Sequence, residues 1–246
     1  MWNEKIADMI LYEDKEILVC QKPAGLAVQS AGVGKADMES CLKNYLAGKG
    51  NGKVPYLGII HRLDQPVEGV LVFAKTPEAA KNLSRQMTQG SMGKYYLAAT
   101  EGEPPSKEGV LVDWLKKDGK TNTSFVVSPH TKGAKQARLS YRVLESTAES
   151  PANTRKYLLE IHLHTGRHHQ IRVQMAHAGM ALIGDRKYNS KEKAFVPLGL
   201  CAESLHFSHP KTGEKMEFKV TPSGAAFLGF QIHTQKRSEE RRVGKE

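Results

Sequence analysis

The stretch His61-Arg62-Leu63-Asp64 lies between two apolar runs, residues 54–60 and residues 69–74. Short apolar runs of this kind predict buried strands, so we expect the four residues at the exit of one strand and before the next. A carboxylate in that position, beside an arginine, lies near the interior and still faces solvent. Such a position is typical of a reactive carboxylate; a structural salt bridge between Asp64 and Arg62 is the alternative.

The composition indicates a soluble protein with a polyanionic partner. Its 246 residues contain 36 Lys and Arg against 26 Asp and Glu, which gives a net charge of +10. Such a charge favours binding of nucleic acid through its phosphates, although net charge speaks to association and not to fold. A basic protein that binds no polyanion is the alternative at this point.

Several classes of protein and site are not expected. No run approaches the roughly 20 apolar residues of a membrane helix, and residues 1–10 lack the apolar core of a signal peptide. The cysteines, Cys20, Cys41 and Cys201, are odd in number and lack metal-binding spacing. We therefore expect reduced thiols, a cytoplasmic location and no zinc site.

Strands dominate the expected secondary structure. They are predicted at residues 17–20, 94–100, 109–115, 137–144 and 157–163, with further short strands between residues 202 and 220. One helix is expected from Pro77, capped by Thr76, and another from Ile171 to a stop near Gly179. Residues 116–120 are expected as a basic loop. This order of elements favours an α+β fold over regular strand–helix alternation.

Five motifs occur in order between about residue 10 and residue 222, and together they resemble the RluA-type RNA pseudouridine synthases. They are Tyr12-Glu13-Asp14 through Lys22-Pro23-Ala24-Gly25, His61-Arg62-Leu63-Asp64 with Gly69, Lys94-x-Tyr96-x-Ala98, Thr165-Gly166-Arg167-x-His169-Gln170-Ile171-Arg172, and Gly184-Asp185-x-x-Tyr188. The resemblance implies one catalytic domain, residues 1–235, with a mixed, largely antiparallel sheet, flanking helices and a basic cleft. Residues 236–246 lie beyond it and are charged, so we expect a disordered tail.

The resemblance also implies an activity, the isomerisation of uridine in RNA to its C-glycoside without cofactor or metal. Asp64 is then the catalytic carboxylate, either as nucleophile or as base. Arg172 is its ion partner, which favours the ionised carboxylate; an arginine that faces solvent is the alternative. Tyr96 stacks on the target uracil, and ordinary packing in a strand is the alternative.

Substrate-binding residues are expected around these three. The resemblance places Arg62, His61, Arg167, His169 and Gln170 there. Arg62 is expected to fill the space left by the departing base or to hold a phosphate, and His61 to bond to backbone and shape the turn. Further lysines either line the RNA path or form a solvated face; they are Lys116, Lys117, Lys120, Lys132 and Lys135.

Two departures from the family pattern bear on the substrate. Val67-Glu68-Gly69 stands where many relatives have Thr-Ser-Gly, and His168 stands where they have threonine. We expect Glu68 to add a carboxylate near the site that repels a phosphate. The expected partner is a ribosomal or transfer RNA loop, which costs least to unstack; no membrane, no obligatory protein partner and a monomer are expected.

Two other functions are weighed against this one. An RNA-binding protein that keeps the fold without catalysis is the first. A metal-dependent hydrolase is the second, because histidines crowd together at His162, His164, His168 and His169. The intact set of Asp64, Tyr96 and Arg172 argues against the first, and the lack of carboxylate or thiolate partners nearby argues against the second.

Overall fold

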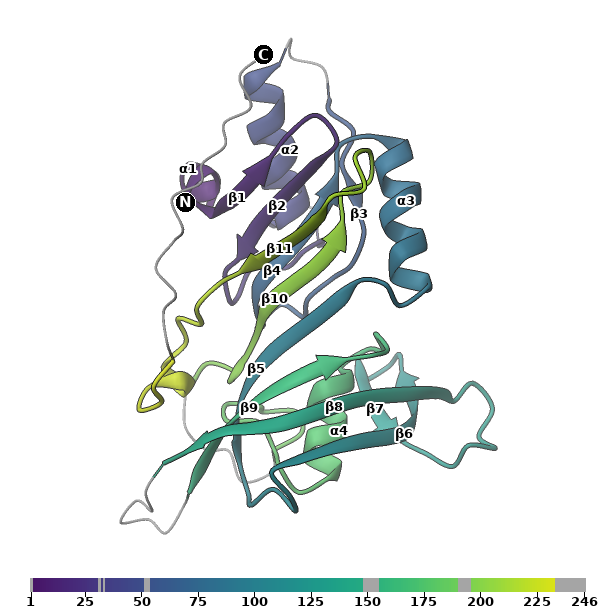
Figure 1. The fold of residues 1–246 in the computed structure, drawn as a ribbon, viewed down its shortest axis with the longest axis vertical. Helices are drawn as coiled ribbons and strands as arrows, with labels where there is room; N and C mark the ends of the chain where they lie inside the picture. Colours follow the sequence, from purple (N-terminus) through teal and green to yellow (C-terminus); the bar gives the residue numbers. More distant parts are fainter. Residues whose placement is uncertain are drawn as a thin grey trace.

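The computed structural model describes residues 2–30, 32, 34–50, 54–147, 155–189 and 196–232. These residues form an 11-stranded sheet with helices on both faces (Figure 1). The strands are β1 (Ile10–Glu13), β2 (Ile17–Lys22), β3 (Gly58–Ile59), β4 (Glu68–Ala74), β5 (Gly93–Glu101), β6 (Glu108–Asp118), β7 (Thr123–Val126), β8 (Lys135–Ser146), β9 (Lys156–Leu163), β10 (Leu200–Ser208) and β11 (Lys215–Lys219).

The sheet is mixed and largely antiparallel, which confirms the prediction. Its strand order is β1-β2-β4-β10-β5-β9-β8-β6-β7, with β11 paired to β10 and β3 paired to β4. Among the described strands only β4 and β10 run parallel, and they share two residue pairs, Glu68 with Cys201 and Gly69 with Ala202. Gly69 has φ +135, and a Cβ there would lie 2.4 Å from the Ala202 carbonyl oxygen, so this close strand approach requires glycine.

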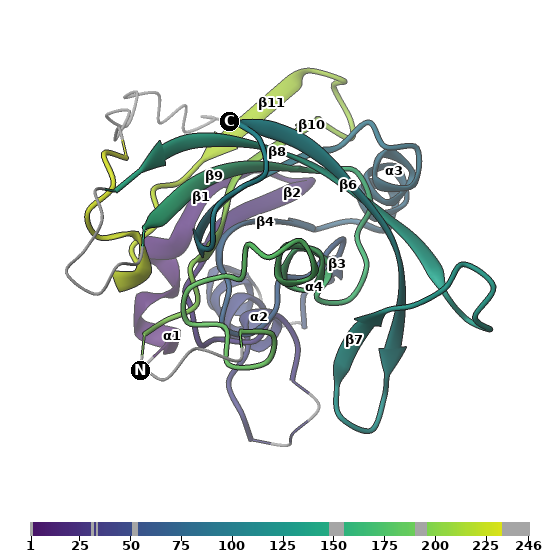
Figure 2. The same ribbon diagram turned by 90° about the horizontal axis from the view of Figure 1, so that it is seen from below.

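Helices cover the two faces of the curved sheet unequally. Figure 2 shows α2 (Met38–Lys49) and α4 (Gln170–His177) inside the curve and α3 (Pro77–Thr88) outside it. The short elements α1 (Trp2–Lys5), η1 (Ile6–Met9) and η2 (Ala225–Phe227) complete the described chain. Among the described residues, no helix is both long enough and apolar enough to span a bilayer.

Each face of the sheet has its own hydrophobic core, because successive side chains on a strand point to opposite faces. The inner core joins Leu18, Phe73 and Ile161 to α4. The outer core joins Val72 of β4 to Leu83 of α3. Strand β4 is buried along its whole length. The Asp64 loop therefore enters a strand that both cores hold in place.

Several local predictions are confirmed. The Thr76 side chain accepts the Ala79 amide and Pro77 opens α3, as the capping pattern predicted. Helix α4 ends before Gly179, which has φ +80, as expected for a glycine after a helix. The strands predicted at residues 17–20, 94–100, 137–144 and 157–163 lie within β2, β5, β8 and β9.

Other local predictions are wrong. The run at residues 54–60 was expected as a strand, but β3 covers only two of its residues and Val54 is 84% exposed. β3 pairs only with Phe73 and Ala74 of β4, and the next amide of β4, that of Val72, bonds to the His61 side chain instead of to a backbone carbonyl, so the ladder ends there. Residues 116–118 belong to β6 and pair with β7, so only residues 119–120 remain of the expected basic loop.

Helix α2 was not predicted. Asp37 and Ser40 form a reciprocal capping box at its start. The α2 residues Met38, Cys41 and Leu42 are buried. The apolar spacing of residues 38–49 is weak, which is why no helix was expected there. The expected disordered tail, residues 236–246, lies outside the described residues.

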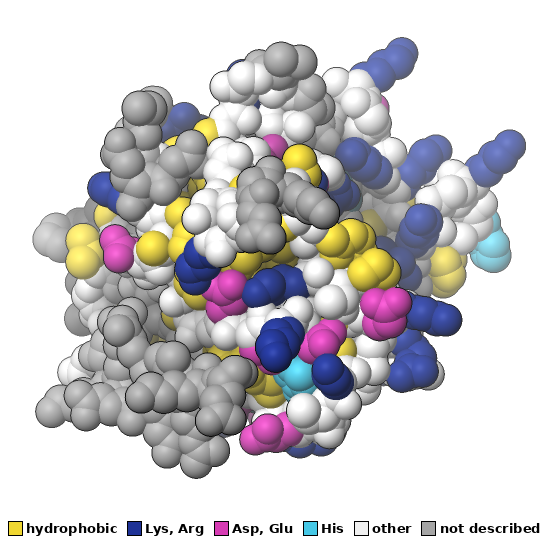
Figure 3. Space-filling view, turned by 90° about the horizontal axis from the view of Figure 1, so that it is seen from above, with side chains coloured by type: hydrophobic (Ala, Val, Ile, Leu, Met, Phe, Trp, Pro, Cys, Tyr) yellow, Lys and Arg dark blue, Asp and Glu magenta, His cyan; other side chains and the backbone are white. Residues whose placement is uncertain are grey.

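Basic side chains are unevenly distributed over the surface. In Figure 3 Lys and Arg gather along the right side of the molecule, with few acidic side chains among them. Basic side chains gathered in this way attract a polyanion that approaches this side of the molecule.

Candidate active site

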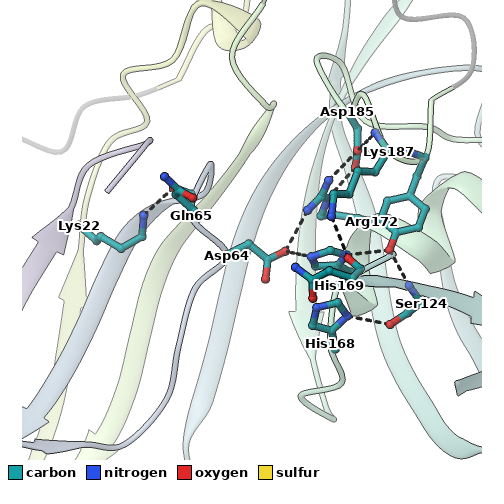
Figure 4. Close-up of polar contacts among 11 residues, drawn as sticks. Lys22, Asp64, Gln65, Ser124, His168, His169, Arg172, Asp185 and Lys187 are labelled. Carbon is teal, nitrogen blue, oxygen red and sulfur yellow. Dashed lines mark hydrogen bonds and ion pairs between the residues drawn. The ribbon is translucent and has the colours of Figure 1, made fainter. Parts of the chain in front are cut away.

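Asp64 lies in the loop between β3 and β4, and hydrogen bonds fix that loop on both sides. The Asp64 carbonyl accepts the Val67 amide at 3.0 Å, which closes a turn. The Gln65 carbonyl accepts the Gly25 amide at 2.9 Å and Lys22 Nζ at 3.1 Å, and the Gln65 side chain donates to the Gly25 carbonyl. The loop is thus fastened to the Lys22-Pro23-Ala24-Gly25 turn (Figure 4).

Arg172 from α4 meets the Asp64 carboxylate. Its Nη1 lies 3.2 Å from Asp64 Oδ2, while its Nε and Nη2 each donate to Asp185 at 2.8 Å. The Arg172 side chain is 5% exposed, so it does not face solvent. Burial alone lowers the pKa of Arg172, but hydrogen bonds and charge from Asp185 and Asp64 raise it above the ordinary value. Arg172 is therefore a fixed cation beside a partly exposed carboxylate.

His169 approaches the same carboxylate from the start of α4. Its Nε2 lies 3.6 Å from Asp64 Oδ2, and its Nδ1 lies 2.7 Å from the Tyr188 hydroxyl. That hydroxyl oxygen accepts the Ser124 amide, so its own proton is free to be donated to His169 Nδ1. The proton of a neutral His169 then sits on Nε2, toward Asp64. Burial, with the charge of Arg172, lowers the pKa of His169 to about 4 against the opposing effect of Asp64.

Tyr96 lies on the inner face of β5 and is 7% exposed. Burial and then the negative charge of Asp64 raise the pKa of Tyr96 above its ordinary value, so its hydroxyl keeps its proton near neutral pH. Tyr95 lies on the outer face of the same strand and stacks on His162. Of the two adjacent tyrosines, only Tyr96 is on the Asp64 side of the sheet.

The other predicted residues take different positions. His61 Nε2 accepts the Val72 amide at 3.4 Å, and burial together with Lys94 lowers the pKa of His61 to about 3. Arg62 is exposed. Arg167 is exposed as well, and its Nε donates to the Gln136 carbonyl at 2.8 Å.

Gln170 is buried, and its polar atoms bond within the protein. Its Oε1 accepts the Thr165 hydroxyl at 2.7 Å and the Arg167 amide at 3.0 Å, and its Nε2 donates to the Arg138 carbonyl and to Gln174. Gln170 therefore holds the loop before α4 in shape.

Comparison with known proteins decides the family. Residues 16–177 match the family model described as RNA pseudouridylate synthase. Ribosomal large subunit pseudouridine synthase D of Zymomonas mobilis is 33% identical over 222 residues, which cover 85% of this chain and 67% of that protein. The chain belongs to the RNA pseudouridylate synthase family.

Other members agree with this assignment. Dual-specificity RNA pseudouridine synthase RluA of Salmonella typhimurium is 36% identical over 214 residues, covering 86% of this chain and 92% of that protein. The solved structure of human RNA pseudouridylate synthase domain containing 4 superposes with a TM-score of 0.73 at 22% identity, covering 90% of this chain and 91% of that one. This structural likeness shows the pseudouridine synthase fold, and the sequence matches show an RNA-modifying isomerase.

One expectation about this pseudouridine synthase is wrong. Glu68 was expected to present a carboxylate near the site, but it is 3% exposed. It accepts the Ser223 amide at 3.0 Å, the Ser223 hydroxyl at 2.5 Å and the Gly224 amide at 3.0 Å. Its charge is satisfied inside the protein, and it joins the start of β4 to the segment after β11.

Some site residues of this synthase were missed. Lys22 is fully buried and donates to the carbonyls of Pro23, Leu26 and Gln65; burial lowers its pKa to about 8 against the opposing charges of Asp64 and Glu68. Asp185 and Tyr188 stood in a quoted motif but were given no role. The signal available in the sequence was their place in the motif Gly184-Asp185-x-x-Tyr188, which could have marked both as partners of the site residues.

The four crowded histidines do not form one cluster. His162 and His164 contact each other with ring centroids 4.3 Å apart, and His162 also stacks on Tyr95 of the outer face. His168 stacks on His169 beside Asp64, with ring centroids 3.8 Å apart. Among the described residues, no group of three or more His, Cys, Asp or Glu is placed to hold a metal ion.

Proposed function

We propose that this pseudouridine synthase modifies uridines in loops of ribosomal or transfer RNA, with Asp64 as its catalytic carboxylate. The observation that carries the proposal is the contact of Asp64 with Arg172, itself anchored by Asp185. Two ionised groups in an ordered pair are costly to bury unless each has partners. Here Arg172 bonds to both Asp185 and Asp64, whereas the Asp64 side chain stays 28% exposed and open to a substrate.

In the proposed reaction the N1–C1′ bond of uridine breaks and a C5–C1′ bond forms after the base has turned. The proton lost from C5 is balanced by the proton gained at N1. Asp64 serves either as nucleophile or as the base that removes a sugar proton, and both need it ionised. Arg172 holds that carboxylate in one orientation, since its fork-shaped guanidinium is fixed by two bonds to Asp185.

Tyr96 is proposed to lie against the extruded uracil. Its ring is on the Asp64 side of the sheet, and base stacking on such a ring is worth about 1 to 3 kcal/mol. His169, with a proton on Nε2, is proposed to contact the substrate or Asp64 as a neutral donor. Arg62 and Arg167 are exposed and are proposed to bind phosphates. For His61 and Gln170 we propose a supporting role, because their polar atoms bond within the protein.

The remaining proposals concern the protein as a whole. We propose one catalytic domain over residues 1–235 that acts in the cytoplasm as a monomer without an obligatory protein partner, binding RNA in a basic cleft. The three cysteines are buried and unpaired, as suits a reducing compartment.

The test is a map of pseudouridines in total RNA from cells with and without the gene. The proposal expects one or a few sites in ribosomal or transfer RNA to disappear and to return with the wild-type gene. Purified protein should then form pseudouridine at those sites in a transcript. Loss of sites confined to another class of RNA would contradict the proposed substrate.

A further inference from the structure

A row of four rings crosses the outer face of the sheet, on the side away from Asp64. The rings belong to His164 and His162 of the β9 end, Tyr95 of β5 and His206 of β10. The ring centroids are 4.3 Å apart for His164 and His162, 4.5 Å for His162 and Tyr95, and 4.9 Å for Tyr95 and His206. His162 and Tyr95 are nearly parallel, with 16° between their planes. We call these four side chains the ring row.

Strand register builds the ring row. Tyr95 pairs with His162 on one side and with Ser204 on the other, so the rings stand on neighbouring strands at one level. Gly93 leaves room for both Tyr95 and His206, because a Cβ at Gly93 would lie 3.1 Å from the Tyr95 ring and 3.4 Å from the His206 Cβ. Because the central rings already stack on each other, a further flat group can stack only at the ends of the row.

One end of the ring row is open. His164 is exposed, and its Nε2 lies 3.1 Å from the Ser140 hydroxyl, which orients the ring. Burial, with the charge of Arg138, lowers the pKa of His164 below its ordinary value, so its ring is neutral near pH 7. Arg138 is exposed, and by strand alternation it points to the same face as Ser140. The other end of the row is less open to an anion, since Glu217 lies 3.3 Å from His206.

The His164 end adjoins the active site. His164 directly precedes Thr165-Gly166-Arg167, the loop that leads to His169 and α4. The backbone of Arg138 joins the two regions, because its carbonyl accepts the amides of His164 and Thr165 and the Gln170 side chain. One short loop therefore runs from His164 on the outer face, past the exposed Arg167, to the start of α4.

We propose that His164 is a stacking site for an unpaired nucleotide that flanks the target uridine, with Arg138 beside it for the phosphate. Three further rings lie behind His164 in the ring row, and base stacking on an aromatic ring tolerates any base. The occupant is RNA because the open end combines a neutral ring that can stack on a base with a hydroxyl and a guanidinium that can bond to the sugar and phosphate. The inference rests on the proposed function in that RNA is the substrate.

The test uses a decauridylate with one 4-thiouridine and the full-length protein in three variants. His164→Ala removes the ring, His164→Phe keeps a flat ring, and Leu228→Ala is a control outside the proposed site, where Leu228 is 75% exposed. We expect His164→Ala to bind the probe about fivefold or more weakly than wild type. His164→Phe and Leu228→Ala should bind within twofold of wild type, and photo-cross-links to the peptide with residue 164 should disappear only in His164→Ala.

Two results would overturn the inference. One is equal affinity of His164→Ala and Leu228→Ala; the other is an equal loss in His164→Ala and His164→Phe, which would mean that stacking is not involved. Pseudouridine formation in cellular RNA is measured with the same preparations. If wild type makes no pseudouridine but binding still depends on a ring at residue 164, the proposed reaction fails and the stacking site stands. If product forms and binding is unaffected, only the stacking site fails.

Discussion

Arg172 Nη1 and Asp64 Oδ2 lie 3.2 Å apart although 108 residues separate them in the chain. The rest of the Arg172 guanidinium is committed to Asp185, which is 1% exposed. The Asp64 carboxylate is thus oriented from a helix on the inner face of the sheet, while its own loop is fastened to Lys22 and Gly25. Because Arg172 bonds to both Asp64 and Asp185, we expect the activity to depend on the fork shape of its guanidinium as well as on its charge.

Replacing Arg172 with lysine should lower pseudouridine formation at least about tenfold, because an ammonium group cannot bond to Asp185 and Asp64 in the same fork. A steady-state rate on a substrate RNA measures this. Arg142→Lys is the matched control, since Arg142 forms an exposed pair with Glu160 that contributes little. Equal rates for Arg172→Lys and Arg142→Lys would refute the positioning role of Arg172.

Tyr96 should matter through its ring. Tyr96→Leu is expected to weaken RNA binding by about 1 to 3 kcal/mol, whereas Tyr96→Phe should bind almost as wild type does, because a phenyl ring stacks equally well. Binding of the same RNA to both variants in the Asp64→Asn background measures stacking without turnover. Equal affinities of the two variants would mean that Tyr96 only packs in β5.

Glu68 should contribute to stability more than to substrate choice. Glu68→Ala removes the charged acceptor of the Ser223 and Gly224 amides and of the Ser223 hydroxyl, so we expect a loss of about 2 to 3 kcal/mol in the free energy of unfolding. Ser223→Ala should cost about 1 kcal/mol, and the double variant should lose less than the sum of the two, since both act on one set of bonds. Urea unfolding measures all three, and strict additivity would argue against the shared contact.

His169 should make the fold sensitive to acid. Its pKa in the folded protein is about 4, below the value of about 6.5 in an unfolded chain. Between these values the unfolded state binds more protons, so stability falls as the pH is lowered from about 6.5 toward 4. His169→Gln should remove up to about 1.4 kcal/mol per pH unit from that slope. Unfolding at a series of pH values tests this, and an unchanged slope would show that His169 titrates normally.

Short motifs were enough to predict which residues the candidate site brings together. The structure places Arg172 against Asp64 and Tyr96 in the core on the same side of the sheet, while their roles in catalysis stay predictions. The role of Glu68 could not be predicted, because its partner Ser223 is 155 residues away and its neighbour in the sequence was the Asp64 loop. A buried Lys22 is equally hidden from sequence, since lysine is almost always exposed. The length of β3 could not be predicted either, because it depends on the His61 side chain, which accepts the Val72 amide of β4.

The most direct measurement is pseudouridine formation by Asp64→Asn on an RNA that the wild-type protein modifies. Asparagine keeps the size of the side chain and a hydrogen-bond acceptor for Arg172 but cannot act as an anionic nucleophile or base. The account predicts RNA affinity within about twofold of wild type and no detectable pseudouridine. Product formed by Asp64→Asn at a rate near that of the wild-type protein would contradict it.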